Sequence, residues 1–157
     1  MLRRRLVATG LSLVTLAPLW LPRPSLAAEN LVFVTGAFRR SIPVSDLEYL
    51  AETGKARGLL SDVLALAKQD PTKVAKLLKD SVSLPVSLVS RLLNTRIGEA
   101  LLKRVGAILS PLNANSESVA ALRSAVILGL VQGKGSLSAI SFFKAYPTQE
   151  LEVSIPA

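Results

Sequence analysis

The sequence contains no histidine and no cysteine among its 157 residues. Without histidine the chain lacks the usual general base near neutral pH and the commonest zinc ligand. Without cysteine it lacks thiolate nucleophiles, thiolate metal sites and disulfide bonds. Most hydrolytic mechanisms are thereby excluded, and we predict no catalytic residue, no cofactor and no metal site. Packing alone must then hold the fold together, which a hydrophobic fraction of 50% makes feasible.

The first 27 residues have the organisation of an export signal. Arg3 to Arg5 form a positively charged start, and a mostly apolar stretch follows from residue 6 to residue 21. Ser25-Leu26-Ala27 places small residues at both specificity positions of a signal peptidase site. We therefore predict cleavage after Ala27 and an exported mature chain of residues 28–157.

Two alternatives stay open for this segment. Arg3-Arg4 followed by Leu6-Val7 loosely resembles a twin-arginine signal, although three consecutive arginines also occur in ordinary secretory signals. An uncleaved membrane anchor fits less well. A spanning helix needs about 20 apolar residues, and Pro18 and several polar residues interrupt this shorter run.

Removal of the signal changes the charge balance. Four of the 19 basic residues belong to the signal, which leaves 15 basic against 11 acidic residues and a net charge of +4. This excess is confined to residues 62–104. A solvated helix face explains its basic residues most simply, and contact with an anionic lipid surface or an acidic partner is the functional alternative. The residues concerned are Lys73, Lys76, Lys79, Arg91, Arg96, Lys103 and Arg104. Nucleic acid is not expected as a partner, because the region has no aromatic residue for base stacking.

The mature chain has the length of one domain, and its middle part shows helical periodicity. Asp70-Pro71, Pro85 and Asn94-Thr95 interrupt the pattern, and each can begin a new helix. A helix from Ser116 to about Val131 is apolar all round in its second half, which predicts a central position. Ser136 is predicted to cap a last helix. The stripes predicted to face the core are Leu59, Leu60, Val63, Leu64 and Ala67; Val74, Leu77 and Leu78; Leu88, Val89, Leu92 and Leu93; and Ile97, Leu101, Val105 and Ile108.

The two ends of the mature chain are predicted to form strands. Residues 31–35 and 38–44 favour a β-hairpin around Gly36-Ala37. At the other end, Leu151, Val153 and Ile155 alternate with polar residues, as in a half-buried strand. We expect this strand to pair antiparallel with the hairpin. The predicted fold is therefore α+β and mostly α, with a bundle of about six helices and a small antiparallel sheet formed by the N-terminal hairpin and the C-terminal strand.

Two groups of residues between these strands have counterparts in catalytic sites. Ser141 and Lys144 have the S-x-x-K spacing of penicillin-recognising enzymes, but the companion motifs are missing, so a capped helix with an exposed lysine explains them better. Glu48 and Glu52 lie four residues apart and could form a carboxylate pair. A capping box between Ser45 and Glu48, opening a helix that ends before Gly54, accounts for them more simply.

Four segments taken together resemble a known family. They are G-A-F-R-R-S-I-P-V-S-D-L-E (Gly36 to Glu48), A-E-T-G (Ala51 to Gly54), S-R-L-L-N-T-R-I-G-E-A-L-L (Ser90 to Leu102) and A-L-R-S-A-V-I-L (Ala121 to Leu128). The most specific stretch is T-x-I-G-E-A-L-L (Thr95 to Leu102). The family is the cyanobacterial domain of unknown function filed under alpha/beta hydrolases, domain-of-unknown-function family 1400. The resemblance implies a cyanobacterial source, and hence the periplasm, the thylakoid lumen or the cell exterior.

The resemblance also implies that such a domain commonly precedes a separate hydrolase domain. A hydrolase of that fold needs a serine in G-x-S-x-G and a histidine, and this sequence has neither. We therefore predict a non-catalytic exported accessory or interaction module, with an alpha/beta hydrolase or another exported protein as its partner. Two alternatives remain: a minimal hydrolase that uses serine, lysine or carboxylates, and a lipid-binding or membrane-surface-binding domain.

Overall fold

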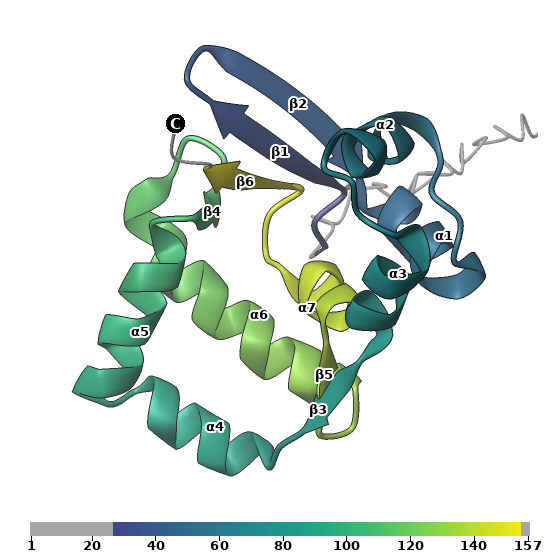
Figure 1. Cartoon of the computed structure of the whole chain (residues 1–157). Coiled ribbons are helices and arrows are strands. Elements are labelled where there is room, and N and C mark those ends of the chain that lie inside the picture. Colours follow the sequence, from purple (N-terminus) through teal and green to yellow (C-terminus); the bar gives the residue numbers. More distant parts are fainter. Residues whose placement is uncertain (1–26, 155–157) are drawn as a thin grey trace, which may run out of the picture.

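The structure is a computed structural model that describes residues 27–154, and these fold into seven α-helices, one 3₁₀ helix and six short strands (Figure 1). The predicted export signal and Ile155 lie outside the described residues. The elements in chain order are β1 (Asn30–Thr35), β2 (Phe38–Pro43), α1 (Val44–Thr53), α2 (Gly58–Leu66), α3 (Pro71–Lys79), β3 (Ser81–Ser83), α4 (Val86–Leu93), α5 (Arg96–Gly106), β4 (Leu109–Pro111), η1 (Asn115–Glu117), α6 (Ser118–Gln132), β5 (Ser136–Ser138), α7 (Ala139–Ala145) and β6 (Glu150–Ser154).

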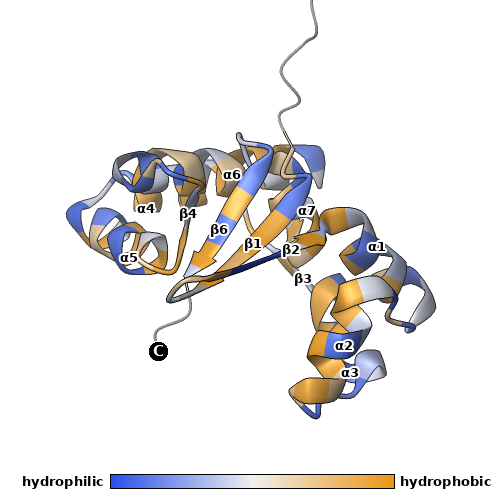
Figure 2. Ribbon diagram, turned by 90° about the horizontal axis from the view of Figure 1, so that it is seen from above, coloured by the Kyte–Doolittle hydropathy of each residue, from blue (hydrophilic) through white to orange (hydrophobic). Residues whose placement is uncertain are grey.

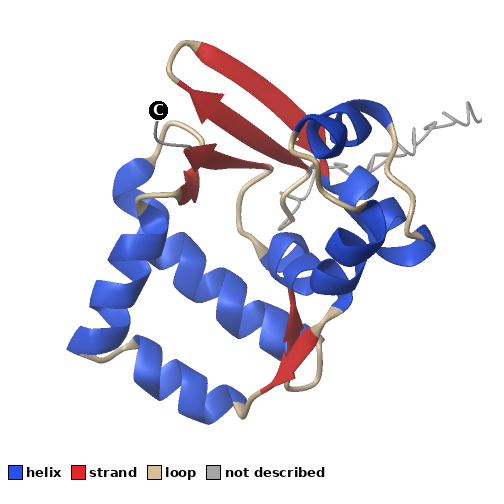
Figure 3. Ribbon diagram, viewed as in Figure 1, coloured by secondary structure: helices blue, strands red, loops and turns tan. Residues whose placement is uncertain are grey.

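The predicted fold class is confirmed, because the domain is mostly helical with a small sheet joining the two ends of the mature chain (Figure 3). Helix α6 occupies the centre, as its composition predicts, and contacts α4, α5, α7, β4 and β5. Its residues Leu122, Ala125 and Leu130 are almost fully buried. The prediction of burial all round does not hold for Leu128 and Val131, which are exposed.

The four-stranded sheet has the order β2-β1-β6-β4 and corrects the predicted strand pairing. The hairpin of β1 and β2 is present, with Gly36 in the left-handed region at its turn (φ 58°). Strand β6, however, pairs parallel with β1 and antiparallel with β4. A parallel neighbour requires a long crossover connection, which the helices between β1 and β6 supply. The sequence prediction missed β4, because three residues that include Pro111 show no alternation.

The burial of β6 follows the predicted alternation in the part that the structure describes. Leu151 is fully buried and faces Leu31 and Pro111 on the neighbouring strands. Val153 is half-buried, and Glu150 is exposed. Glu152, predicted to lie near water, is half-buried like Val153. The period-two pattern therefore identified the burial of Leu151 correctly, but it did not separate Glu152 from Val153 and did not identify the neighbouring strand.

Local signals at helix ends had mixed outcomes. Asp70 and Thr95 cap α3 and α5 with their side chains, as predicted, and Gly54 ends α1 in the left-handed conformation. The predicted Ser45–Glu48 capping box is wrong, since α1 begins at Val44 and Ser45 lies inside its first turn. The first N–H of the helix, of Val44, donates to the Glu29 carbonyl.

A second, two-stranded sheet corrects the start of the last helix. Residues 136–138 form β5, which pairs antiparallel with β3 and therefore cannot begin a helix. The cap of α7 is accordingly Ser138 rather than the predicted Ser136. Ser138 and Ser141 form a reciprocal capping box at this helix start.

Candidate functional site

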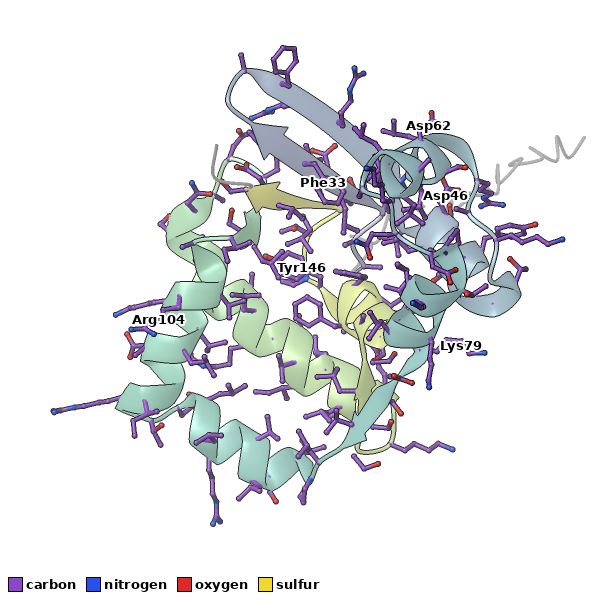
Figure 4. The ribbon with its side chains drawn as sticks, in the orientation of Figure 1. Phe33, Asp46, Asp62, Lys79, Arg104 and Tyr146 are labelled. Atoms are coloured by element: carbon purple, nitrogen blue, oxygen red, sulfur yellow. The ribbon has the colours of Figure 1, made fainter. Side chains whose placement is uncertain are left out.

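The seven predicted basic residues are all exposed, but the fold divides them into two groups. Lys73, Lys76 and Lys79 lie on α3, which packs against α1 and α7. The other four lie on α4 and α5, which pack against α6: Arg91, Arg96, Lys103 and Arg104. Figure 4 places the labelled Lys79 and Arg104 on opposite sides of the molecule. Any surface contact would therefore use one group or the other.

All four predicted core stripes are correct only in part. Val63, Ala67 and Leu77 of the first two stripes are exposed, and α4 and α5 correct the other two. Val89 and Leu93 are buried as expected, whereas on α5 the buried positions are Gly98, Leu102 and Gly106. The side chains that remain 50–79% exposed on this helix pair and at its end are Leu88, Leu92, Ile97, Leu101 and Ile108. Figure 2 shows hydrophobic residues beside hydrophilic ones along both helices.

Two glycines explain why α5 buries such a narrow face. A Cβ added to Gly98 would overlap the Leu92 carbonyl oxygen and lie 2.7 Å from the Leu93 Cα. A Cβ on Gly106 would lie 2.5 Å from the Ser118 hydroxyl oxygen. Because α5 approaches its neighbours closely at the glycines, its larger apolar side chains project elsewhere. The sequence prediction had assigned Ile97 and Leu101 to the core because they belong to the row of large apolar residues on this helix.

The turn between α4 and α5 is held by a local hydrogen-bond pair. The Thr95 hydroxyl accepts from the Gly98 N–H (3.1 Å) and donates to the Leu92 carbonyl (2.7 Å). These residues fall in or beside T-x-I-G-E-A-L-L, the most specific stretch of the family resemblance. Its threonine and glycine therefore fix how α5 leaves α4, and Ile97 and Leu101 of the same stretch are presented to solvent.

The charges on this helix pair are unequal. Glu99 is the acidic residue of α4 and α5, and it pairs with Lys103 (2.8 Å), whose hydrogen bond lowers the pKa of this carboxyl. Within the part of the chain that the structure describes, the ion pairs include none of Arg91, Arg96 and Arg104. We call this surface the α4–α5 face: the five exposed apolar side chains together with these three arginines.

The S-x-x-K residues are engaged separately. The Ser141 hydroxyl accepts from the Ser138 N–H (2.8 Å) and donates to the Ser138 carbonyl (3.0 Å). The Lys144 ammonium forms an ion pair with the Glu48 carboxylate (2.8 Å), on α1. Lys144 is thus exposed, as predicted, but its ammonium group is held by the ion pair with Glu48. Among the described hydrogen bonds, none joins Ser141 to Lys144.

The carboxylate pair does meet at a cavity. Glu48 and Glu52 both line a cavity of about 230 Å³, together with Lys79, Lys144 and Ser138. Glu48 is engaged by Lys144, and the Ser138 hydroxyl is engaged in the α7 cap. In residues 27–154 no group of three or more acidic side chains is arranged to hold a metal ion.

The fold and these sites define a small, mostly helical domain with a mixed sheet and an exposed apolar and basic helix pair. Residues 27–154 match the family described as alpha/beta hydrolase of unknown function (DUF1400), so the chain belongs to this family. No curated protein and no solved structure matches the chain. Within the described range, none of the helices has both the length and the apolar character needed to cross a membrane.

Proposed function

We propose that the chain is an exported, non-catalytic interaction module that binds the catalytic domain of an alpha/beta hydrolase through its α4–α5 face. The observation that carries this proposal is the exposure of four large apolar side chains on two adjoining helices and of Ile108 just after the second helix. Soluble domains rarely leave contiguous apolar surface uncovered unless it is used for binding. We infer a hydrolase as the class of partner because the family to which the chain belongs is described as alpha/beta hydrolase.

The composition of the face suits a protein–protein contact. Burying an aliphatic side chain completely contributes roughly 1.5–3 kcal/mol, so Leu88, Ile97 and Leu101 can form an apolar centre. Arginine is enriched in protein interfaces and can supply polar contacts beside that centre. Arg91, Arg96 and Arg104 are free of ion pairs within the described domain, and they favour a partner surface that carries carboxylates.

The non-catalytic part of the proposal is supported by chemistry. An acyl-transfer enzyme needs a nucleophile within reach of a base. Ser141 is hydrogen-bonded within its own helix cap, and Lys144 is directed to Glu48. The chain contains no histidine to take the place of the lysine.

The second candidate is binding to an anionic membrane surface, which the same unpaired arginines favour. Helices that lie on membranes combine an apolar face with basic residues, and long basic side chains can reach the lipid headgroups from beside it. This candidate uses the same α4–α5 face, so the two proposals differ in the partner and not in the residues.

Titration calorimetry with purified exported alpha/beta hydrolases of the source organism tests the proposal. We expect the exported chain to bind one of them, and Leu101→Asp or Ile97→Asp to weaken binding roughly tenfold or more, because a charge would be buried at the centre of the contact. The matched control is Leu77→Asp, since Leu77 on α3 is 69% exposed and lies outside the face. It should leave the affinity unchanged.

Two outcomes would contradict the hydrolase as partner. If Leu101→Asp and Leu77→Asp bind the hydrolase equally well, the α4–α5 face is not the contact. If no hydrolase binds, but vesicles containing phosphatidylglycerol do and those of phosphatidylcholine do not, the face is a membrane-binding surface. Loss of vesicle binding with Arg96→Gln would then identify the charge involved.

A further inference from the structure

The predicted cleavage site lies at the first residue of the folded domain. Ala28, which would become the new N-terminus, has only 3% of its surface exposed. The N–H of Ala28 belongs to the Ala27–Ala28 peptide bond, and it donates to the Phe143 carbonyl at the end of α7 (3.0 Å). The bond that a signal peptidase would cut is therefore already engaged by a distant part of the chain.

The residues that follow are fixed just as firmly. The Glu29 N–H donates to the Gln149 carbonyl (2.7 Å), and the Glu29 carbonyl accepts from the Val44 N–H (2.8 Å). Asn30 begins β1 and pairs with Pro43 and Glu150 on both sides. No flexible linker separates Ala28 from the sheet. A peptidase would have to detach the start of the domain to obtain an extended substrate.

We propose that Ala27–Ala28 is a processing site that folding closes, so that the chain crosses the membrane unfolded and is cleaved before residues 28–30 dock. This inference rests on the export part of the proposed function. Proteases cut a folded chain through its open states, so a site held by long-range contacts is cut slowly. A twin-arginine route would deliver a folded chain with its site closed, whereas the general secretory route delivers an unfolded one.

The folded domain can also bind the new N-terminus that cleavage produces. Hydrolysis adds water across the Ala27–Ala28 bond, leaving a carboxylate on Ala27 and an ammonium group on Ala28. The ammonium can keep the hydrogen bond to the Phe143 carbonyl, now assisted by charge. It also faces a cavity of about 330 Å³ whose lining includes both partners of the Glu48–Lys144 ion pair. The mature N-terminus is then held in place rather than free.

The test compares three folded or unfolded forms of the whole precursor as substrates of a purified signal peptidase in detergent. The first is the wild-type chain, folded as judged by circular dichroism. The second carries a flexible glycine-serine linker and a second alanine inserted after Ala28, so that the site stands clear while the added alanine docks. The third is Leu151→Asp, which places a charge at a fully buried position of β6 and prevents folding.

We expect the linker form and the unfolded Leu151→Asp form to be cleaved after Ala27 roughly tenfold or more faster than the folded wild type. Equal cleavage of wild type and linker form would overturn the closure of the site. If neither the linker form nor the unfolded form is cleaved, Ala27 is not a processing site, and the export part of the proposed function fails instead. In cells, Arg4→Lys changes the arginine pair that a twin-arginine route would need, and we expect it to leave export unchanged. Loss of export in this variant would contradict the general secretory route.

Discussion

At the scale of single residues, Tyr146 has an unusual environment. Its side chain lies in the interior of the domain, near the ring of Phe142 (Figure 4). Its hydroxyl oxygen is buried and has no hydrogen-bond partner among the described residues. Burial raises the pKa of this phenol well above its ordinary value, because the ionised form would be desolvated.

Removing the hydroxyl should therefore not harm the fold. We expect Tyr146→Phe to keep or raise the free energy of unfolding, by up to about 1–3 kcal/mol, since it deletes an unsatisfied polar group. The wild type should lose stability above about pH 10, where the unfolded tyrosine ionises and the folded one does not. Urea unfolding at neutral and alkaline pH should show this contribution disappearing in Tyr146→Phe.

The other tyrosine provides the control for this prediction. Tyr49 is partly exposed and lies against the Arg57 guanidinium group, 4.6 Å from its ring centre. Tyr49→Phe should leave the alkaline loss of stability in place. A clear destabilisation by Tyr146→Phe at neutral pH would mean that the phenol has a partner, and our account of this residue would be wrong.

Single residues also show which local predictions succeed. Asp70 and Thr95 were predicted as caps because a cap needs only its own helix, and both accept hydrogen bonds from N–H groups two or three residues ahead. Ser45 failed as a cap, because α1 begins one residue before it, at Val44, whose N–H donates to the carbonyl of Glu29, far away in sequence. Lys144 and Glu48 are joined by the same kind of long-range contact, which no spacing rule indicates.

At the scale of elements, the α4–α5 pair shows what periodicity cannot decide. Both helices have apolar residues on more than one face, so the sequence predicts amphipathic helices without stating which side is buried. The close approach at Gly98 makes that choice. Strand β6 is similar, because its alternation predicted the burial of Leu151 and gave no indication of a parallel neighbour.

Filling the space at Gly98 should disrupt this pair. We expect Gly98→Ala to lower the free energy of unfolding by about 3 kcal/mol, because the new Cβ meets rigid backbone atoms of Leu92 and Leu93 rather than a mobile side chain. Chemical denaturation measures the change. Ala100→Ser, at an exposed position of the same helix, should change stability by less than about 0.7 kcal/mol. Equal effects of the two substitutions would remove the role assigned to Gly98.

At the scale of the whole molecule, composition predicted more than motifs did. The mostly α fold and the central α6 followed from apolar patterning, and the family resemblance is confirmed by the match over residues 27–154. The exposed apolar face was not predicted, because every apolar stripe was assigned to the core. The partner of the α4–α5 face could not be predicted either, because binding depends on the residues of the partner, and these are not part of this sequence.

The purified chain should accordingly show no ester hydrolysis that depends on a particular residue. We expect wild type, Ser141→Ala and Lys144→Met to hydrolyse short-chain nitrophenyl esters at the same background rate, because hydroxyl and ammonium are committed to Ser138 and Glu48. Circular dichroism must confirm that Lys144→Met keeps the fold without the ion pair. Turnover abolished by both substitutions in folded protein would restore the hydrolase assignment to this chain.

Because β6 lies between β1 and β4, the four-stranded sheet can form only after the C-terminal strand has been synthesised. Leu31, near the start of the domain, pairs with Leu151, near its end, and all seven described α-helices lie between them in the sequence. Pairings so distant in sequence are slow to form, because a long loop must close before any contact compensates for the lost entropy. During synthesis β1 has only its hairpin partner, and a two-stranded hairpin is marginally stable in water. The interval before the last strand arrives is the time in which the N-terminal segment remains open to other proteins.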